Sequence, residues 1–324
     1  MPFSTLMKQY VRWRSFVAAA MLLTACKKDS DLLVVGSRLT EQNTLGTFVA
    51  VHGVPKQLFT LTAASDSFQF KTVQGNRLTF PANAFLLPSG MRPNTTPISV
   101  EFREITSKSD MVLSAMPTTA GEQLLESAGQ FYLKAKQGTT VLHLAPATHL
   151  RLSFQNTRLS SGTSNLQLFY GTTIKTLFNW LPQSNTDIVS GVSQDSVPGQ
   201  PRAYRIRLNN DSLGWVNCGR IITRTPQTTV SISVAGENVQ GTNTMVFLVF
   251  KALNSVVRAY PQTDNMFAAP NIPQGLQATV VVLRNVNDTY YLGQQTAQVG
   301  ANHVFSPSMS SVSEAAAVAA IQAL

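Results

Sequence analysis

Gly75-Asn76-Arg77-Leu78-Thr79-Phe80-Pro81-Ala82-Asn83-Ala84-Phe85 is the stretch of sequence that decides the fold. Pro81 has no amide hydrogen to donate to a β-ladder, so a strand that reaches it must end there. Asn83 is one of the few residues other than glycine that tolerates a left-handed backbone, which suits a tight turn. The stretch therefore predicts a strand and a turn, after which the chain returns as a second strand over residues 98–105.

Alternation of apolar and polar residues continues on both sides of this stretch. It occurs at Phe68 and Phe70; Ile98, Val100 and Phe102; Phe131 and Leu133; Leu150, Leu152 and Phe154; and Leu166 and Leu168. A period of two with one apolar face is typical of half-buried antiparallel strands. Turn signals such as Pro88-Ser89-Gly90 and Gln137-Gly138 separate the segments. No long amphipathic helix is expected before residue 310, so the predicted fold class is all-β.

A second alternating block follows a polar stretch. Residues 183–201 are rich in Ser, Gln and Pro, which predicts a linker. Residues 202–324 alternate again, which predicts a second antiparallel β-sandwich of immunoglobulin-like or transthyretin-like type. Trp215 is expected to anchor its core, because a large aromatic side chain dominates burial in a sandwich. Ser311 and Glu314 have capping-box spacing before an alanine-rich run, which predicts one short C-terminal helix.

The first block carries a resemblance to known proteins. A strand that ends in Pro81, followed by the turn residue Asn83 and an Ala-Phe pair, resembles the sandwich domain of ankyrins and netrin receptors, where Gly usually takes the place of Asn83. The run between Phe102 and Phe131 is similar to uncharacterised Bacteroidetes lipoproteins and surface proteins. The resemblance covers about residues 70–182. It implies that residues 56–182 form an ankyrin- or netrin-receptor-type sandwich at a cell surface, and it implies no reaction.

The N-terminal residues have the pattern of a bacterial lipoprotein signal. A basic start precedes the apolar run of residues 16–23, and Leu23-Thr24-Ala25-Cys26 then looks like a lipobox. The apolar run is far shorter than the roughly 20 residues of a spanning helix. Residues 1–25 are therefore predicted to be removed, leaving Cys26 as a lipidated N-terminus and residues 26–55 as a tether. The alternative is an ordinary secretory signal in which the cysteine is incidental.

Lipidation of Cys26 predicts a place on the outer membrane. Bacterial lipoproteins carry at least two acyl chains, and two chains hold a protein stably where one binds reversibly. Lys27 stands where the familiar signal for inner-membrane retention has Asp. Residues 27–31 resemble the charged tether of Bacteroidetes surface lipoproteins, although Lys27 and Lys28 make it less acidic. We therefore expect the folded part to face the cell exterior, with the periplasmic face as the alternative.

The charge distribution argues against a nucleic-acid partner. The 324 residues carry a formal net charge of +9. Removal of residues 1–25, which hold three basic and no acidic residues, lowers this charge to +6. The basic residues are scattered, whereas nucleic-acid binding requires them to cluster on one face.

The number and positions of the cysteines predict an inert thiol in the folded part of the protein. Only Cys26 and Cys218 occur, so acylation of the first leaves the second without a disulfide partner. Cys218 alternates inward on the strand expected at residues 215–218. A buried free thiol of this kind is inert.

The other candidates for catalysis or metal binding form no recognisable motif. The four histidines are far apart and lack zinc-site spacing: His52, His143, His149 and His303. Glu101 and Glu104 are an odd number of strand positions apart, so their side chains should point to opposite faces and not form a glycosidase pair. Asp110 and Glu126 fall in loop-like sequence and are expected to bind turn amides. We therefore predict no catalytic, cofactor-binding or metal-binding residue.

These observations favour a lipid-anchored outer-membrane protein with a non-catalytic binding or assembly role at the cell surface. Its partners would be the membrane, through the anchor, and envelope proteins or polysaccharide. The alternative is a secreted hydrolase or carbohydrate-active enzyme whose residues converge from separate loops. An enzyme should have a pocket with two convergent carboxylates or a His–carboxylate pair, whereas a binding module should have a flat or aromatic-lined face.

Overall fold

The protein is built mainly of antiparallel strands and carries three helices, so the predicted all-β class with a short C-terminal helix is confirmed. The computed structural model describes residues 44–62, 64–146, 148, 150–155, 158–160, 165–174, 177–182, 191–195, 203–208, 213–263 and 265–324. The predicted signal of residues 1–25, Cys26 and the first part of the tether lie outside the described residues.

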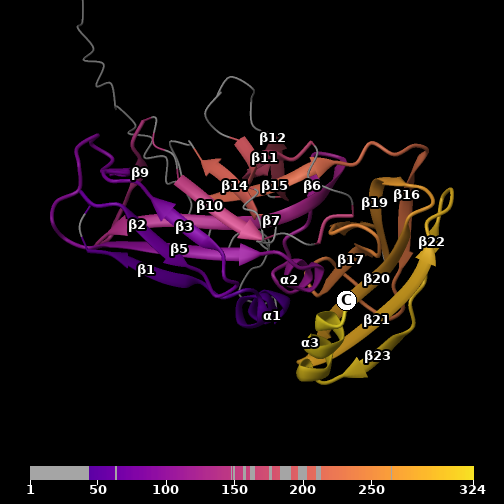
Figure 1. The fold of residues 1–324 in the computed structure, drawn as a ribbon. Coiled ribbons are helices and arrows are strands. Elements are labelled where there is room, and N and C mark those ends of the chain that lie inside the picture. The colour runs from indigo at the N-terminus through magenta and orange to yellow at the C-terminus, as the bar shows by residue number, and fades with distance from the viewer. Residues whose placement is uncertain are drawn as a thin grey trace, which may run out of the picture.

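Two facing antiparallel sheets form the first unit (Figure 1). The larger sheet has the order β1 (Gln57–Leu61), β5 (Ile98–Ile105), β7 (Gln123–Gln137), β15 (Trp215–Ile221), β11 (Gln167–Ile174) and β12 (Leu177–Pro182). The smaller sheet has the order β13 (Gly191–Asp195), β14 (Ala203–Leu208), β10 (Leu150–Gln155), β3 (Arg77–Phe80) and β2 (Phe68–Lys71). Short strands complete the unit: β4 (Phe85–Leu86) pairs with β9 (His143–Leu144), and β6 (Thr119–Ala120) and β8 (Thr140–Val141) pair with β7.

The core of the first unit lies between these sheets and follows the alternation of the sequence. On β5, Ile98, Val100 and Phe102 are buried against residues of β3 and β10 from the opposite sheet. Strand β3 ends at Phe80, directly before Pro81, as predicted. Asn83 has a φ of 56°, so the predicted left-handed turn is also confirmed.

One continuous eight-stranded sheet forms the second unit. Its order is β22 (Val304–Phe305), β16 (Gln227–Ser233), β19 (Met266–Pro273), β18 (Val256–Thr263), β17 (Thr244–Phe250), β20 (Gln277–Val286), β21 (Thr289–Gln298) and β23 (Met309–Val312). The core of this unit joins inward side chains from both arms of the sheet, for example Ile232 of β16 and Val280 of β20. The two layers are therefore halves of one sheet that folds over itself about β18.

The boundary between the units differs from the predicted linker at residues 183–201 and the predicted second unit at residues 202–324. Strand β13 lies within the predicted linker and pairs with β14, and β14 pairs with β10 of the smaller sheet. Strand β15 pairs with β7 on one side and β11 on the other. The first unit thus extends to Ile221. Alternation identifies a strand but not its partner, because strand pairing depends on residues far away in the sequence.

The predicted tether of residues 26–55 also needs correction. Its final third contains helix α1 (Thr44–His52), whose Leu45 and Phe48 are fully buried. These two side chains belong to a hydrophobic cluster between the units, which we call the junction cluster. A short helix that contributes only two buried residues has too weak a periodic signal to be seen in sequence.

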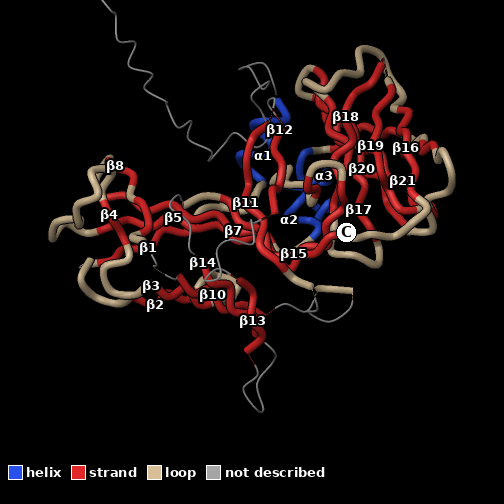
Figure 2. The backbone as a smooth tube through the Cα atoms, turned by 90° about the horizontal axis from the view of Figure 1, so that it is seen from above, coloured by secondary structure: helices blue, strands red, loops and turns tan. Residues whose placement is uncertain are grey.

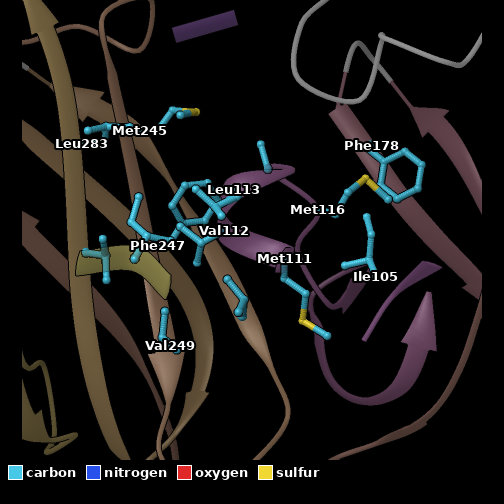
Figure 3. Packing of buried hydrophobic residues seen from close by; sticks show 14 of the residues in the cluster. Ile105, Met111, Val112, Leu113, Met116, Phe178, Met245, Phe247, Val249 and Leu283 are labelled. Carbon is cyan, nitrogen blue, oxygen red and sulfur yellow. The ribbon is translucent and has the colours of Figure 1, made fainter. Parts of the chain in front are cut away.

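The junction cluster holds the two units together through α1, α2 (Lys108–Leu113) and α3 (Glu314–Gln322), which gather between the strand-rich ends of the molecule (Figure 2). Val112 and Leu113 of α2 lie beside Phe247 and Val249 of the second unit (Figure 3). On the other side of α2 the cluster includes Ile105, Met116 and Phe178 of the first unit. The free energy gained by burying apolar side chains is roughly proportional to the area buried. Both units bury apolar area in this cluster, so separating them would cost that free energy.

Strand β7 reaches all three clusters of buried apolar residues. Phe131 and Leu133 lie in the core of the first unit, whereas Leu125 and Tyr132 belong to the junction cluster. Leu124, which is 2 % exposed, enters the core of the second unit. One fifteen-residue strand therefore contributes to every core of the molecule.

Hydrogen bonds reinforce the junction. Thr118 N donates to the carbonyl of Val256 at 2.7 Å, and Val256 N donates to Thr118 Oγ1 at 2.9 Å. Asn254 Nδ2 donates to the carbonyls of Thr106 at 2.9 Å and Ser127 at 2.8 Å. These bonds satisfy buried backbone groups that would otherwise be costly to remove from water.

Replacement of Leu124 by Ala should destabilise the whole molecule, because it leaves a cavity where β7 enters the second core. We expect a loss of about 2–5 kcal/mol in the free energy of unfolding, in one cooperative transition. Urea denaturation followed by circular dichroism measures it. Leu177→Ala is the matched control, since Leu177 is 47 % exposed and should change stability by no more than about 0.5 kcal/mol. Two separate transitions in the Leu124 variant would contradict the coupling.

Candidate functional site

The histidines that sequence analysis singled out remain separate in the structure. His52 Nε2 lies 2.6 Å from Glu314 Oε1, and this contact joins α1 to α3. His143 lies in β9, and the His303 ring packs edge-on against Phe305 at a centroid distance of 4.5 Å. His149 lies outside the described residues. Within the described part of the chain, no three His, Cys, Asp or Glu side chains are placed to share a metal ion.

Glu101 and Glu104 point to opposite faces of β5, as predicted. Glu101 lies on the outer face, where Lys56 Nζ approaches its carboxylate at 3.2 Å and Lys136 Nζ at 3.1 Å. Glu104 points inward and is 1 % exposed. The two carboxylates therefore share no substrate space, and the pair required for glycoside hydrolysis is not formed here.

Four neutral donors surround the buried Glu104 carboxylate. Oε1 accepts from Gln57 Nε2 at 3.0 Å and from Gln74 N at 3.0 Å. Oε2 accepts from Thr72 Oγ1 at 2.8 Å and from Asn76 Nδ2 at 2.8 Å. A buried carboxylate persists only when its oxygens are hydrogen-bonded in this way. Glu104 thus fastens the turn between β2 and β3 to the larger sheet.

Glu126 forms a buried ion pair. Its side chain is 0 % exposed, and Oε2 accepts from Arg220 Nε at 2.9 Å. Ser160 donates to the same carboxylate through its amide at 2.6 Å and its hydroxyl at 3.0 Å. One loop amide therefore binds Glu126, as expected, but Glu126 itself lies in β7 and Asp110 in helix α2, not in loops.

Trp215 and Cys218 are both structural residues on β15. Trp215 is 5 % exposed and packs against Tyr132 with a centroid distance of 5.2 Å, which confirms its role as a core anchor. Trp215 packs in the junction cluster, however, and not in the core of the second unit where it was expected. Cys218 is fully buried, and burial raises the pKa of its thiol well above the usual range.

Unlike the two buried glutamates, Arg258 and Tyr260 of β18 are polar side chains that are only half-buried, and they share one face of the strand. The Arg258 Cζ atom is 5.8 Å from the centroid of the Tyr260 ring and 6.0 Å from that of Phe247. Both side chains are half-buried. The guanidinium and the phenol hydroxyl make no hydrogen bond or ion pair with any residue in the described part of the chain. We call Arg258 and Tyr260 the rim pair.

The strand register explains the position of the rim pair. Arg258 is directly opposite Phe247 of β17, whose side chain lies in the junction cluster. Val256, two residues earlier and about 7 Å along the strand, makes the hydrogen bonds to Thr118 of the first unit. The rim pair therefore stands where the second sheet leaves its contact with the first unit.

Burial shifts the pKa values of both members of the rim pair, yet each keeps its proton at neutral pH. Burial lowers the pKa of Arg258, partly offset by the neighbouring Tyr260, but a guanidinium remains charged at every relevant pH. Burial likewise raises the pKa of Tyr260, more than Arg258 lowers it, so the phenol stays protonated at neutral pH. Neither group can accept a proton as a general base at neutral pH, whereas both can bind.

Sequence analysis did not single out the rim pair. The available signal is the run Val256-Val257-Arg258-Ala259-Tyr260, in which a charged residue and a tyrosine fall on one face of an apolar strand. That face carries Val256 as well, so alternation alone predicts burial and not a site. The register against Phe247 is what separates the pair from an ordinary solvated arginine.

Comparisons with known proteins add no family to these observations. Neither a search of protein-family models nor a search of curated proteins finds a match. None of the helices in the described part of the chain has the length and apolar character to cross a bilayer.

Replacement of Arg220 by Met should cost about 3–5 kcal/mol of stability, because it leaves the Glu126 carboxylate buried without its cation. The double variant Glu126→Gln/Arg220→Met should recover much of this loss, since the Gln oxygen can still accept from Ser160. Urea denaturation of the single and double variants measures both effects. A double variant no more stable than the single one would contradict this account of Glu126.

Cys218 should be unreactive in the folded protein, because a thiol with a raised pKa and no solvent access supplies almost no thiolate. The measurement is labelling by a chromogenic disulfide reagent at pH about 8, near the pKa of an ordinary thiol, in a Cys26→Ala variant that has no other cysteine. We expect labelling only after denaturant is added. Prompt labelling of the native protein would show that β15 opens.

Proposed function

We propose that this protein is a lipid-anchored outer-membrane protein that binds a partner at the cell surface and catalyses no reaction. The observation that carries the anchor is the N-terminal pattern, in which a basic start and an apolar run lead to Leu23-Thr24-Ala25-Cys26. Resemblance of the run between Phe102 and Phe131 to Bacteroidetes surface lipoproteins supports the same location. The acyl chains supply membrane affinity, so the folded part needs no apolar membrane surface of its own.

The arrangement of the chain after Cys26 suits an anchored protein. Residues 27–43 separate the cysteine from helix α1, which packs into the junction cluster. An extended chain of this length spans at most about 60 Å. The anchor would therefore keep helix α1 within about 60 Å of the membrane surface.

Binding rather than catalysis is favoured by how the polar groups are used. Within the described part of the chain, Glu104 and Glu126 are each enclosed by donors and serve as internal braces. The polar groups that remain without a protein partner in the rim pair are a guanidinium, which only donates, and a protonated phenol, which donates or accepts, and neither takes a proton from water at neutral pH. Envelope proteins and polysaccharide are the partner classes that we propose.

Replacement of Cys26 by Ala tests the anchor. We expect the unaltered chain to fractionate with outer membranes and to extract only with detergent, and the variant to lose both properties, because acyl chains provide the membrane affinity. Membrane association that is unchanged in the variant would overturn the lipid anchor. Cys218→Ala is the control, since it removes the other cysteine without touching the signal.

Protease added to intact cells tests the side of the membrane. Degradation of the folded part in intact cells is expected if it faces outward. Protection in intact cells, followed by degradation after the outer membrane is permeabilised, would place the anchored protein on the periplasmic face and contradict the surface location.

A further inference from the structure

We propose that Arg258 and Tyr260 bind the carboxylate of a uronic acid unit in an acidic saccharide. The inference rests on the proposed binding function and names the ligand class at the rim pair. Its first support is the state of the guanidinium. A half-buried charge without a counter-charge is costly, and in the part of the chain that the structure describes the Arg258 guanidinium lies over the Phe247 and Tyr260 rings with no ion pair.

The geometry of the donors selects a carboxylate. A guanidinium presents its N–H groups as a planar fork, which matches the two oxygens of a carboxylate. The Tyr260 hydroxyl can donate or accept, and it is carried by the same rigid strand two residues away. Sugar hydroxyl groups, which also donate and accept, are the natural partners of such a phenol when the neighbouring carboxylate is held by arginine.

The surroundings favour a saccharide over a protein partner. Stable protein interfaces are centred on apolar or aromatic anchors and bury roughly 800 Å² on each side. The eight large apolar side chains exposed in the described part of the chain include none from β17, β18 or β19. Instead the exposed residues on these strands are two prolines, a glutamine and a threonine: Pro261, Gln262, Thr263 and Pro270. The Tyr260 ring and the Arg258 guanidinium can supply the aromatic and charge-assisted contacts of one acidic sugar unit.

The charge pattern favours isolated carboxylates over a dense polyanion. The basic residues of this chain are scattered, and Arg258 is the charged residue of its strand. A single guanidinium can pair with one uronate carboxylate at a time. A phosphate backbone would require several cations along one face.

The test is calorimetric titration of the full-length chain, in mild detergent, with uronic acid trimers of galacturonate, glucuronate and mannuronate. We expect saturable binding of at least one trimer at millimolar concentration or below. The matched neutral hexose trimers should bind at least about tenfold more weakly, because charge-assisted hydrogen bonds are lost. Triglutamate carries the same charges on a peptide and should also bind at least about tenfold more weakly.

Variants of the rim pair locate the binding. Arg258→Gln should weaken uronate binding at least about tenfold, and Arg258→Lys should weaken it as well, because an ammonium cannot form the bidentate pair. Tyr260→Phe keeps the ring and should weaken binding less. Arg224→Gln removes the same charge from an exposed position between β15 and β16 and should bind as the unaltered chain does. Thermal melting confirms that each variant folds.

Four outcomes would overturn the proposal: no saturable binding of any uronate trimer, equal binding of the neutral trimers, binding of triglutamate as tight as that of uronate, or unchanged binding in Arg258→Gln. Equal binding of triglutamate would assign the rim pair to a protein partner. None of these outcomes bears on Cys26, so failure of the ligand assignment is distinguishable from failure of the anchor.

Discussion

Strand β7 is the constraint on which the rest of the structure depends. Its side chains enter the core of the first unit, the junction cluster and the core of the second unit. Any displacement of β7 would therefore disturb three packed interiors at once, and packed interiors tolerate little displacement. The two units are thus packed against each other although their sheets are separate, and the rim pair lies beside this contact.

Buried carboxylates act as braces on this frame, and they do so by two different physical means. Glu104 is stabilised by four neutral donors and ties a hairpin turn to the larger sheet. Glu126 is stabilised by the Arg220 cation and ties the Ser160 loop to β7. Loss of one partner is costly in both arrangements, because Glu104 would lose a hydrogen bond to a buried oxygen and Glu126 would lose its only cation among the described residues. Both also remove the carboxylate from solvent.

The rim pair has the opposite character. Arg258 and Tyr260 lie on a rigid strand, partly shielded from water, with donors that face no protein acceptor in the described part of the chain. Preorganised donors beside aromatic rings recognise a ligand at small entropic cost, because the strand is already ordered. Glu104 and Glu126 thus give internal support, whereas Arg258 and Tyr260 keep their polar groups at the edge of the junction cluster.

The sequence by itself determined the class of structure and much of its local detail. Alternation predicted the strands, Pro81 and Asn83 predicted the end of β3 and its turn, and the odd spacing of Glu101 and Glu104 placed them on opposite faces, because these features depend on neighbouring residues alone. Only the tertiary structure decided that β13, β14 and β15 belong to the first unit and that α1 is packed rather than extended. It also decided that Arg258 stands beside Phe247, with no acidic partner among the residues that the structure describes. These facts depend on strand register and on contacts between residues far apart in the chain, which local patterns do not encode.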